Sequence, residues 1–207
     1  MMCIMSGRRV LAACAAVAVA LAVAGAASAQ STVRVRGTIE KADGNALTVK
    51  TREGATVVIK VPDNVAVAGV LKRTLSDIKA NDFVGIAAMP QSGGPSRALE
   101  VLIFPENMRG TGEGHRGWDL LPESTMTNAT VTESVAKVDG HTLALKYKDG
   151  EQAFIVPPDT PIVTFAPGDK SELKPGAIIF ISGATKADDG TLSAARITVG
   201  RDVPPPM

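Results

Sequence analysis

The chain has 207 residues, with 22 lysines and arginines against 21 aspartates and glutamates, for a formal net charge of +1. This balance favours neither a polyanion-binding protein nor a general trap for acidic ligands. The two cysteines, Cys3 and Cys14, lie in an N-terminal segment that we expect to be removed. The mature chain is therefore expected to hold no disulfide, no thiolate metal site and no cysteine nucleophile.

Residues 1–29 have the pattern of a signal peptide. Arg8-Arg9 forms a positively charged region, residues 10–23 are apolar, and residues 27–29 read Ala-Ser-Ala, a small-x-small cleavage pattern. We therefore expect a periplasmic or secreted protein. Acylation at Cys14, twin-arginine export and a retained membrane anchor are the weaker alternatives. After residue 29 the sequence has no apolar run long enough to span a bilayer, so no integral membrane span is expected once the signal is cleaved.

The remainder of the chain contains an internal repeat. Residues 42–50 match residues 138–146 at a displacement of 96 residues, and residues 98–103 match residues 194–199 at the same displacement. Two such matches in the same order indicate a duplication of about seventy residues.

Alternating apolar residues, with turn residues between them, predict five strands in each copy. A short helical turn is predicted between the third and fourth strands, at 75–79 and 171–174, and it is too short for a βαβ crossover. The predicted strands are 33–41, 46–51, 56–61, 83–89 and 98–104, and then 129–138, 142–147, 152–156, 177–185 and 192–199.

Five strands of this length with one short helical turn predict an all-β fold of two tandem OB-like barrels, because closure removes most open sheet edges. The expected order is a signal peptide at 1–29, a first barrel at 31–104, a linker at 105–127, a second barrel at 128–200 and a Pro-rich tail at 201–207. The residues expected to point inward include Leu47, Val49, Val57, Ile59, Leu143, Leu145, Ile155 and Ile181, together with Phe83, Phe104, Phe154 and Phe180.

Both copies resemble a family of small exported β-domains, a domain of unknown function with an OB-like barrel that recurs in tandem in bacterial envelope proteins. The resemblance rests on residues 41–49, on their counterpart from Val138, and on Leu-Lys-Pro-Gly at 173–176. It covers nearly all of the mature chain and implies no catalytic residue. Proteins similar over the whole chain, with a segment like Gly110–His115, are sometimes labelled metal transport permeases, but this chain lacks the spans that a permease needs.

The linker holds the most unusual chemistry of the sequence. Trp118, Arg109, Arg116 and Asp119 are its candidate ligand or interface residues, and Trp118 is the single tryptophan of the chain. Glu113, His115 and Asp119 offer one imidazole and two carboxylates within seven residues, a mixed set that suits Zn, Mn, Ni or Fe(II). The spacing matches no named ligand motif, so a structural strap held by Trp118 is favoured over this metal site.

Two other function classes find little support in the sequence. Single-strand nucleic-acid binding needs a basic groove with exposed aromatic platforms, and the composition provides neither, so no nucleic-acid partner is expected. Ser124 has no base nearby unless His115 folds back onto it, which leaves an uncharacterised hydrolase as a weak alternative. Asn128-Ala129-Thr130 matches a glycosylation sequon, but the signal peptide looks bacterial.

The expected function is therefore a non-catalytic, exported β-barrel module that binds an envelope protein or a small ligand. A periplasmic metal-binding or metal-transport accessory protein that uses Glu113, His115 and Asp119 is the first alternative, with a divalent transition metal as its cofactor. A hydrolase is the second. The sequence requires no cofactor for the favoured function.

Overall fold

The computed structural model describes residues 31–137 and 140–206, and the predicted signal peptide and the turn at Val138-Asp139 lie outside the described residues. The described residues form an all-β fold whose only helical elements are three single 3-10 turns. None of its helices is long and apolar enough to cross a lipid bilayer. The elements are β1 (Thr32–Asp43), β2 (Ala46–Thr51), β3 (Thr56–Lys60), β4 (Ala66–Arg73), η1 (Leu75–Asp77), β5 (Phe83–Gln91), β6 (Gly94–Ile103), η2 (Glu106–Met108), β7 (Gly114–Gly117), β8 (Thr125–Lys137), β9 (Gly140–Tyr147), β10 (Gly150–Val156), β11 (Ile162–Pro167), η3 (Lys170–Glu172), β12 (Ile178–Lys186), β13 (Leu192–Ser193) and β14 (Arg196–Gly200).

Five strands close into a barrel, which we call the central barrel. Its strands follow one another in the order β5, β6, β10, β9 and β8, and β8 pairs with β5 to complete the ring. Only the β6–β10 pair is parallel. The core of the central barrel includes Val84, Ile86, Leu143, Leu145 and Phe154.

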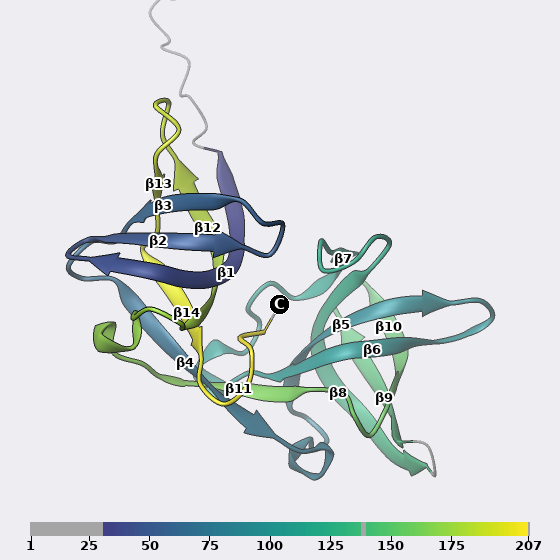
Figure 1. Cartoon of the computed structure of the whole chain (residues 1–207). Helices are drawn as coiled ribbons and strands as arrows, with labels where there is room; N and C mark the ends of the chain where they lie inside the picture. Colours follow the sequence, from purple (N-terminus) through teal and green to yellow (C-terminus); the bar gives the residue numbers. More distant parts are fainter. Residues whose placement is uncertain (1–30, 138–139, 207) are drawn as a thin grey trace, which may run out of the picture. The chain divides into compact units, whose positions relative to one another are not determined.

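A second set of strands, the N-terminal ring, also pairs in a circle. Its order is β1, β2, β3, β13 and β12, with β12 paired antiparallel to β1. A separate core fills it, which includes Val35, Leu47, Val49, Ile59 and Ile181. Figure 1 shows the blue strands β1–β3 beside the yellow-green strands β12 and β13, which come from the opposite end of the chain.

Each ring combines strands from both predicted copies, so the predicted tandem arrangement, in which each copy closes its own barrel, is not confirmed. The N-terminal ring takes its first three strands from the first copy and β12 and β13 from the second, whereas the central barrel takes β5 and β6 from the first copy and β8, β9 and β10 from the second. The strand pairings therefore do not follow the boundaries 31–104 and 128–200. A physical reason is that residues 98–103 and 194–199 have matching sequence patterns, so either segment could offer a similar edge to the first three strands.

Two strands that the sequence analysis did not predict connect the N-terminal ring to the central barrel. β4 and β11 begin 96 residues apart, at equivalent places of the two copies, and pair antiparallel with Val70 opposite Phe165. β4 also pairs in parallel with β14, and β11 pairs in parallel with β6. The paired strands therefore form one continuous path from one ring to the other.

Most of the predicted inward residues are buried, with one correction on β10. Phe154 and Val156 are fully buried there, whereas Ile155 is only half-buried. Because all three residues of Phe154-Ile155-Val156 are apolar, the sequence does not show whether Ile155 or its two neighbours face the core. In the structure the two neighbours do, which places the large aromatic ring in the core. Phe104 and Phe180, which were also expected in the core, are half-buried and line a cavity instead.

Candidate ligand-binding cavity

A cavity of about 240 Å³ lies against the outer face of strands β5 and β6. Strand faces alternate, so Val84 and Ile86 enter the barrel core while Gly85 and Ala87 line the cavity. These two outward residues are small, which leaves room that larger side chains would fill. Further lining residues come from β4, β8, β11, β12, β14, the linker and the C-terminal tail, and they include Ala68, Met126, Phe165, Ser182, Thr198 and Pro206.

Aromatic rings form much of the cavity wall. Phe104 follows β6 and packs against Phe83, with 5.3 Å between ring centroids, and against Phe165, at 6.2 Å. Phe180 on β12 and Trp118 in the linker also line the cavity. An apolar or aromatic ligand would find well-packed surfaces here, because aromatic rings provide large rigid contacts.

Asn128 supplies a buried polar group at this wall. Its side chain is 6% exposed, and its Nδ2 donates a hydrogen bond to the Thr111 carbonyl oxygen at 2.9 Å. Within the described part of the chain, Oδ1 has no hydrogen-bond partner. The bond to Thr111 identifies the amide nitrogen, so the oxygen is the end that lacks a partner. A buried acceptor without a partner is costly, and a donor from a ligand would remove that cost.

Gly85 lets Asn128 lie this close to the strand. A Cβ at Gly85 would be 2.8 Å from Asn128 Oδ1 and 3.1 Å from a carbon of the Phe104 ring. Any side chain at position 85 would therefore require Asn128 or the Phe104 ring to shift. Burial of Asn128 also means that the sequon at 128–130 has no exposed acceptor side chain.

Trp118 is surrounded by arginines. The guanidinium carbon of Arg34 lies 4.3 Å from the ring centroid, and those of Arg36 and Arg116 both lie 5.7 Å from it. Arg36 also lies 4.9 Å from the centroid of Phe180. Cation–π contacts of this kind fix the indole at the cavity wall. Partial burial, and then the charge of Arg34, lower the pKa of Arg116.

Asp119 forms ion pairs and hydrogen bonds with arginines of the N-terminal ring. Its carboxylate accepts from Arg36 at 2.8 Å and from Arg34 at 3.3 Å, and its backbone oxygen accepts from Arg52 at 3.3 Å. Burial acts to raise the pKa of Asp119, but the hydrogen bonds and charges of Arg36 and Arg34 outweigh it and lower that pKa. Within this chain, Trp118 and Asp119 therefore contact arginines of β1, and Asp119 also contacts Arg52, which follows β2.

The structure does not bring Glu113, His115 and Asp119 together. Glu113 accepts from the backbone N–H of Lys148 at 3.1 Å, and His115 Nδ1 lies 2.8 Å from the Thr127 hydroxyl. Across residues 31–137 and 140–206, no group of three or more His, Cys, Asp or Glu side chains is placed to hold a metal ion. The linker is not wholly irregular either, since it contains β7, which pairs with β8.

The remaining predicted residues have local roles. Arg109 forms a two-point ion pair with Glu106, at 2.6 and 2.7 Å, and donates to the Asn81 carbonyl at 2.9 Å, away from the cavity lining. Arg116 lines the cavity and donates to the Gly112 carbonyl at 2.8 Å. Ser124 is buried in a turn, where its hydroxyl lies within hydrogen-bond distance of the Trp118 and Leu121 carbonyls. It is therefore not paired with His115.

A second hollow, of about 390 Å³, adjoins Phe180 on the side of β1 and β2. Arg36 lines it, and the Nε of this 8% exposed side chain has no hydrogen-bond partner among the residues that the structure describes. Pro205 of the tail lines the same hollow. Phe180 is common to both hollows.

Sequence reasoning missed Asn128, Phe165, Phe180 and Pro206 as site residues. The signal that could have indicated them is the pair Gly85 and Ala87 at outward positions of an otherwise apolar strand, because small residues there leave a space for neighbours to line.

No protein-family model, curated protein or solved structure matches the chain. The family resemblance described above therefore stays a prediction.

Proposed function

We propose that this protein is an exported, non-catalytic binding module, and that its ligand has an apolar or aromatic body with at least one hydrogen-bond donor. The observation that carries the proposal is the cavity itself, which four aromatic residues line together with Asn128, whose buried Oδ1 has no partner among the described residues. An apolar body would gain from leaving water, and a donor would satisfy the buried oxygen.

The size of the cavity supports a ligand larger than one ring. A protein cavity of about 150 Å³ binds benzene, and this one measures about 240 Å³. Export is the other part of the proposal, and it rests on the pattern of residues 1–29. Mass spectrometry of protein from the native host should find an N-terminus at Gln30.

The single tryptophan provides the test. Trp118 lines the cavity, so binding can be followed by energy transfer from its indole to N-phenyl-1-naphthylamine, an apolar dye that carries one N–H donor. We expect saturable transfer to the parent protein. An Ala87→Leu variant should lose it, because the added carbons occupy the cavity while Val84 and Ile86 keep the barrel core intact.

Ala42→Leu is the matched control, since Ala42 lies at an exposed position of β1. It should bind the dye as the parent does. Equal transfer in the parent and in Ala87→Leu would show that the dye binds elsewhere and would contradict the proposal. Turnover of hydrolase substrates that depends on His115 would instead favour the enzyme alternative.

A further inference from the structure

We propose that the cavity and the second hollow together form a site for proline-rich peptide segments, and that the chain's own tail occupies this site from within. The inference rests on the proposed binding function and names the chemical class of its ligand. It arises from the position of two consecutive prolines. Pro205 lines the second hollow, Pro206 lines the cavity, and both are buried.

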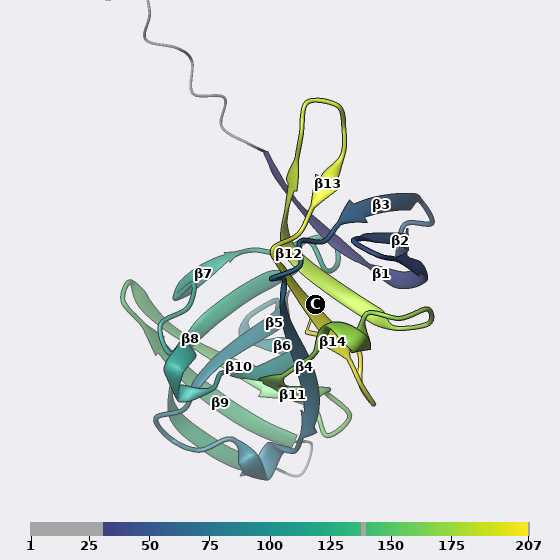
Figure 2. The ribbon, with the colours of Figure 1, turned by 90° about the vertical axis from the view of Figure 1, so that its left-hand side faces the viewer.

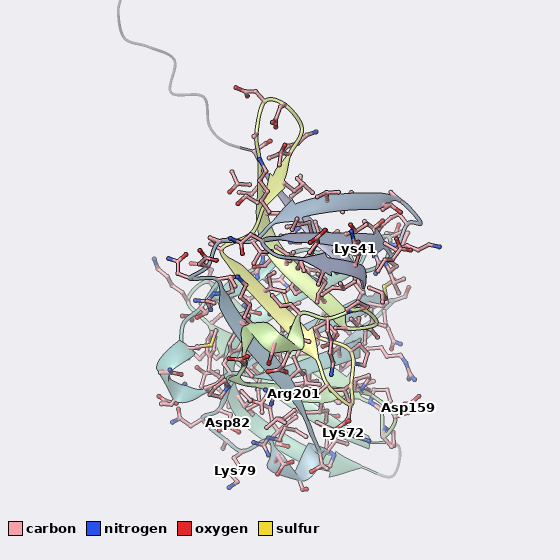
Figure 3. The ribbon with its side chains drawn as sticks, turned by 60° about the vertical axis from the view of Figure 1, so that its left-hand side comes forward. Lys41, Lys72, Lys79, Asp82, Asp159 and Arg201 are labelled. Carbon is pink, nitrogen blue, oxygen red and sulfur yellow. The ribbon has the colours of Figure 1, made fainter. Side chains whose placement is uncertain are left out.

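The tail is guided into the site by its first residues. Arg201, labelled in Figure 3, donates to both carboxylate oxygens of Glu172, at 2.9 and 3.0 Å, and to the Pro167 carbonyl at 2.8 Å. The tail also folds back tightly onto Gly200, the residue before Arg201. A Cβ on Gly200 would be 2.5 Å from the Val203 oxygen and 2.8 Å from Pro205. In Figures 1 and 2 the yellow segment turns back from β14 to the mark C.

Phe180 is shared by the two proline positions. It lines the second hollow together with Pro205 and the cavity together with Pro206. Trp118 is a second aromatic residue that lines the cavity with Pro206. Aromatic-lined grooves are the surfaces on which proline-rich segments dock.

The chemistry of proline fits these surfaces for two reasons. Proline fixes its own φ and restricts the residue before it, so a Val-Pro-Pro-Pro run is already extended and loses little conformational entropy on binding. Such a run also presents carbonyl oxygens without N–H groups. The buried Nε–H of Arg36, unpartnered within the described chain, provides a donor for one of them.

The tail fills the site only in part. Hollows of about 240 and 390 Å³ remain beside Pro206 and Pro205, and Asn128 Oδ1 still lacks a donor with the tail in place. Proline cannot supply that donor. The structure therefore favours a ligand segment in which the prolines are joined by a residue with a free N–H or a hydroxyl.

The test compares the full chain with a variant that lacks residues 203–207 but keeps Arg201 and its hydrogen bonds to Glu172 and Pro167. The probe is a fluorescein-labelled peptide of the tail sequence, Arg-Asp-Val-Pro-Pro-Pro-Met, measured by polarisation. We expect the shortened variant to bind this peptide at least tenfold more tightly than the full chain. The reason is that a tethered tail competes at an effective concentration in the millimolar range. A peptide with its three prolines replaced by alanine should not bind.

A second variant keeps the proposal testable if the shortened chain does not fold. Full-length protein with Pro205→Ala and Pro206→Ala should bind the proline peptide more tightly than the parent, because its tail competes poorly. The proposal is overturned if neither variant binds the peptide, or if the alanine peptide binds equally well. Dye transfer from Trp118 separates this failure from that of the proposed function. If the dye binds and the peptide does not, only the peptide inference fails.

Discussion

Arg36 donates a hydrogen bond from Nη2 to the Asp119 carboxylate at 2.8 Å, which ties strand β1 to the linker. The two partners are unequally buried, since the Arg36 side chain is 8% exposed and that of Asp119 is 47% exposed. The buried guanidinium therefore depends on a half-exposed carboxylate. Loss of the carboxylate would leave Arg36 with the rings of Trp118 and Phe180 as its main neighbours.

Replacement of this carboxylate should destabilise the protein in a pH-dependent way. We expect Asp119→Asn to lower the free energy of unfolding by about 1 kcal/mol at pH 7, a value reduced for the exposure of Asp119. The pKa of Asp119 is lowered in the folded protein. Its contribution is thus complete above an ordinary carboxyl pKa near 4 and is lost as the pH falls through the lower folded value.

Urea unfolding of the parent and of Asp119→Asn at several pH values measures this effect. The difference between the two proteins should be constant from pH 7 to about 5 and should shrink at pH 3 and below. Asp43→Asn is the control, because Asp43 pairs with Lys41 at 3.1 Å on an open surface. A difference that grows towards acid pH would contradict the ion-pair account.

Gly85 should tolerate no side chain, in contrast to a glycine in another strand. Gly85→Ala would press a methyl group against Asn128 and Phe104, and we expect a loss of about 1–3 kcal/mol of unfolding free energy. Gly183 on β12 has nothing within 4 Å of an added Cβ, so Gly183→Ala should be neutral or slightly stabilising. Thermal melts of the two variants decide this, and equal melting temperatures would contradict the close packing at Gly85.

Much of the strand content could be predicted because alternation and turn residues are local. Residues 46–51 were predicted as a strand and form β2, and the short turns predicted before the fourth strand of each copy appear as η1 and η3. β4 was missed because Ala66–Arg73 mixes small and apolar residues without a clear period. The strand exchange could not be predicted either, since pattern matching within a copy does not distinguish between partners from two similar copies.

The site was harder to predict than the fold. Trp118 is the single tryptophan of the chain and lines the cavity, whereas Phe180 has the sequence pattern of an ordinary core residue of an alternating strand. Its exposure to the cavity depends on which strands cover the outer face of β5, a long-range feature. Glu113, His115 and Asp119 are close in sequence, yet each faces a different partner: Glu113 precedes β7, His115 lies in it and Asp119 follows it.

The exchanged strands predict that the two cores unfold together. Each ring contains strands of both copies, and β4 and β11 join the rings through main-chain pairing. We therefore expect one calorimetric transition for residues 31–207, and no folded state for residues 31–104 expressed alone. Trp118→Ala should keep the single transition, because the coupling lies in the strands. Two separate transitions in the parent would contradict this coupling.

The linker should not bind a transition metal through His115. A metal at Glu113, His115 and Asp119 would have to remove Asp119 from Arg36 and Arg34, and His115 from Thr127. If such a site formed, a metal at a hundredfold excess over Kd would stabilise the protein by about 2.7 kcal/mol. We instead expect thermal melts of metal-free protein to be unchanged by Zn, Mn, Ni or Cu.

Two histidine variants make the metal result interpretable. His141 lies on β9, far along the chain from the linker, so His141→Ala reports general binding of metal by imidazole, and His115→Ala reports the linker. A rise in melting temperature in the parent and in His141→Ala, but not in His115→Ala, would contradict the prediction. It would also require the Asp119–Arg36 pair to open, since a carboxylate held by two guanidinium groups gives up strong charge-assisted hydrogen bonds before it can ligate a cation. The rise should then weaken in acid, because His115 must be neutral to bind the metal.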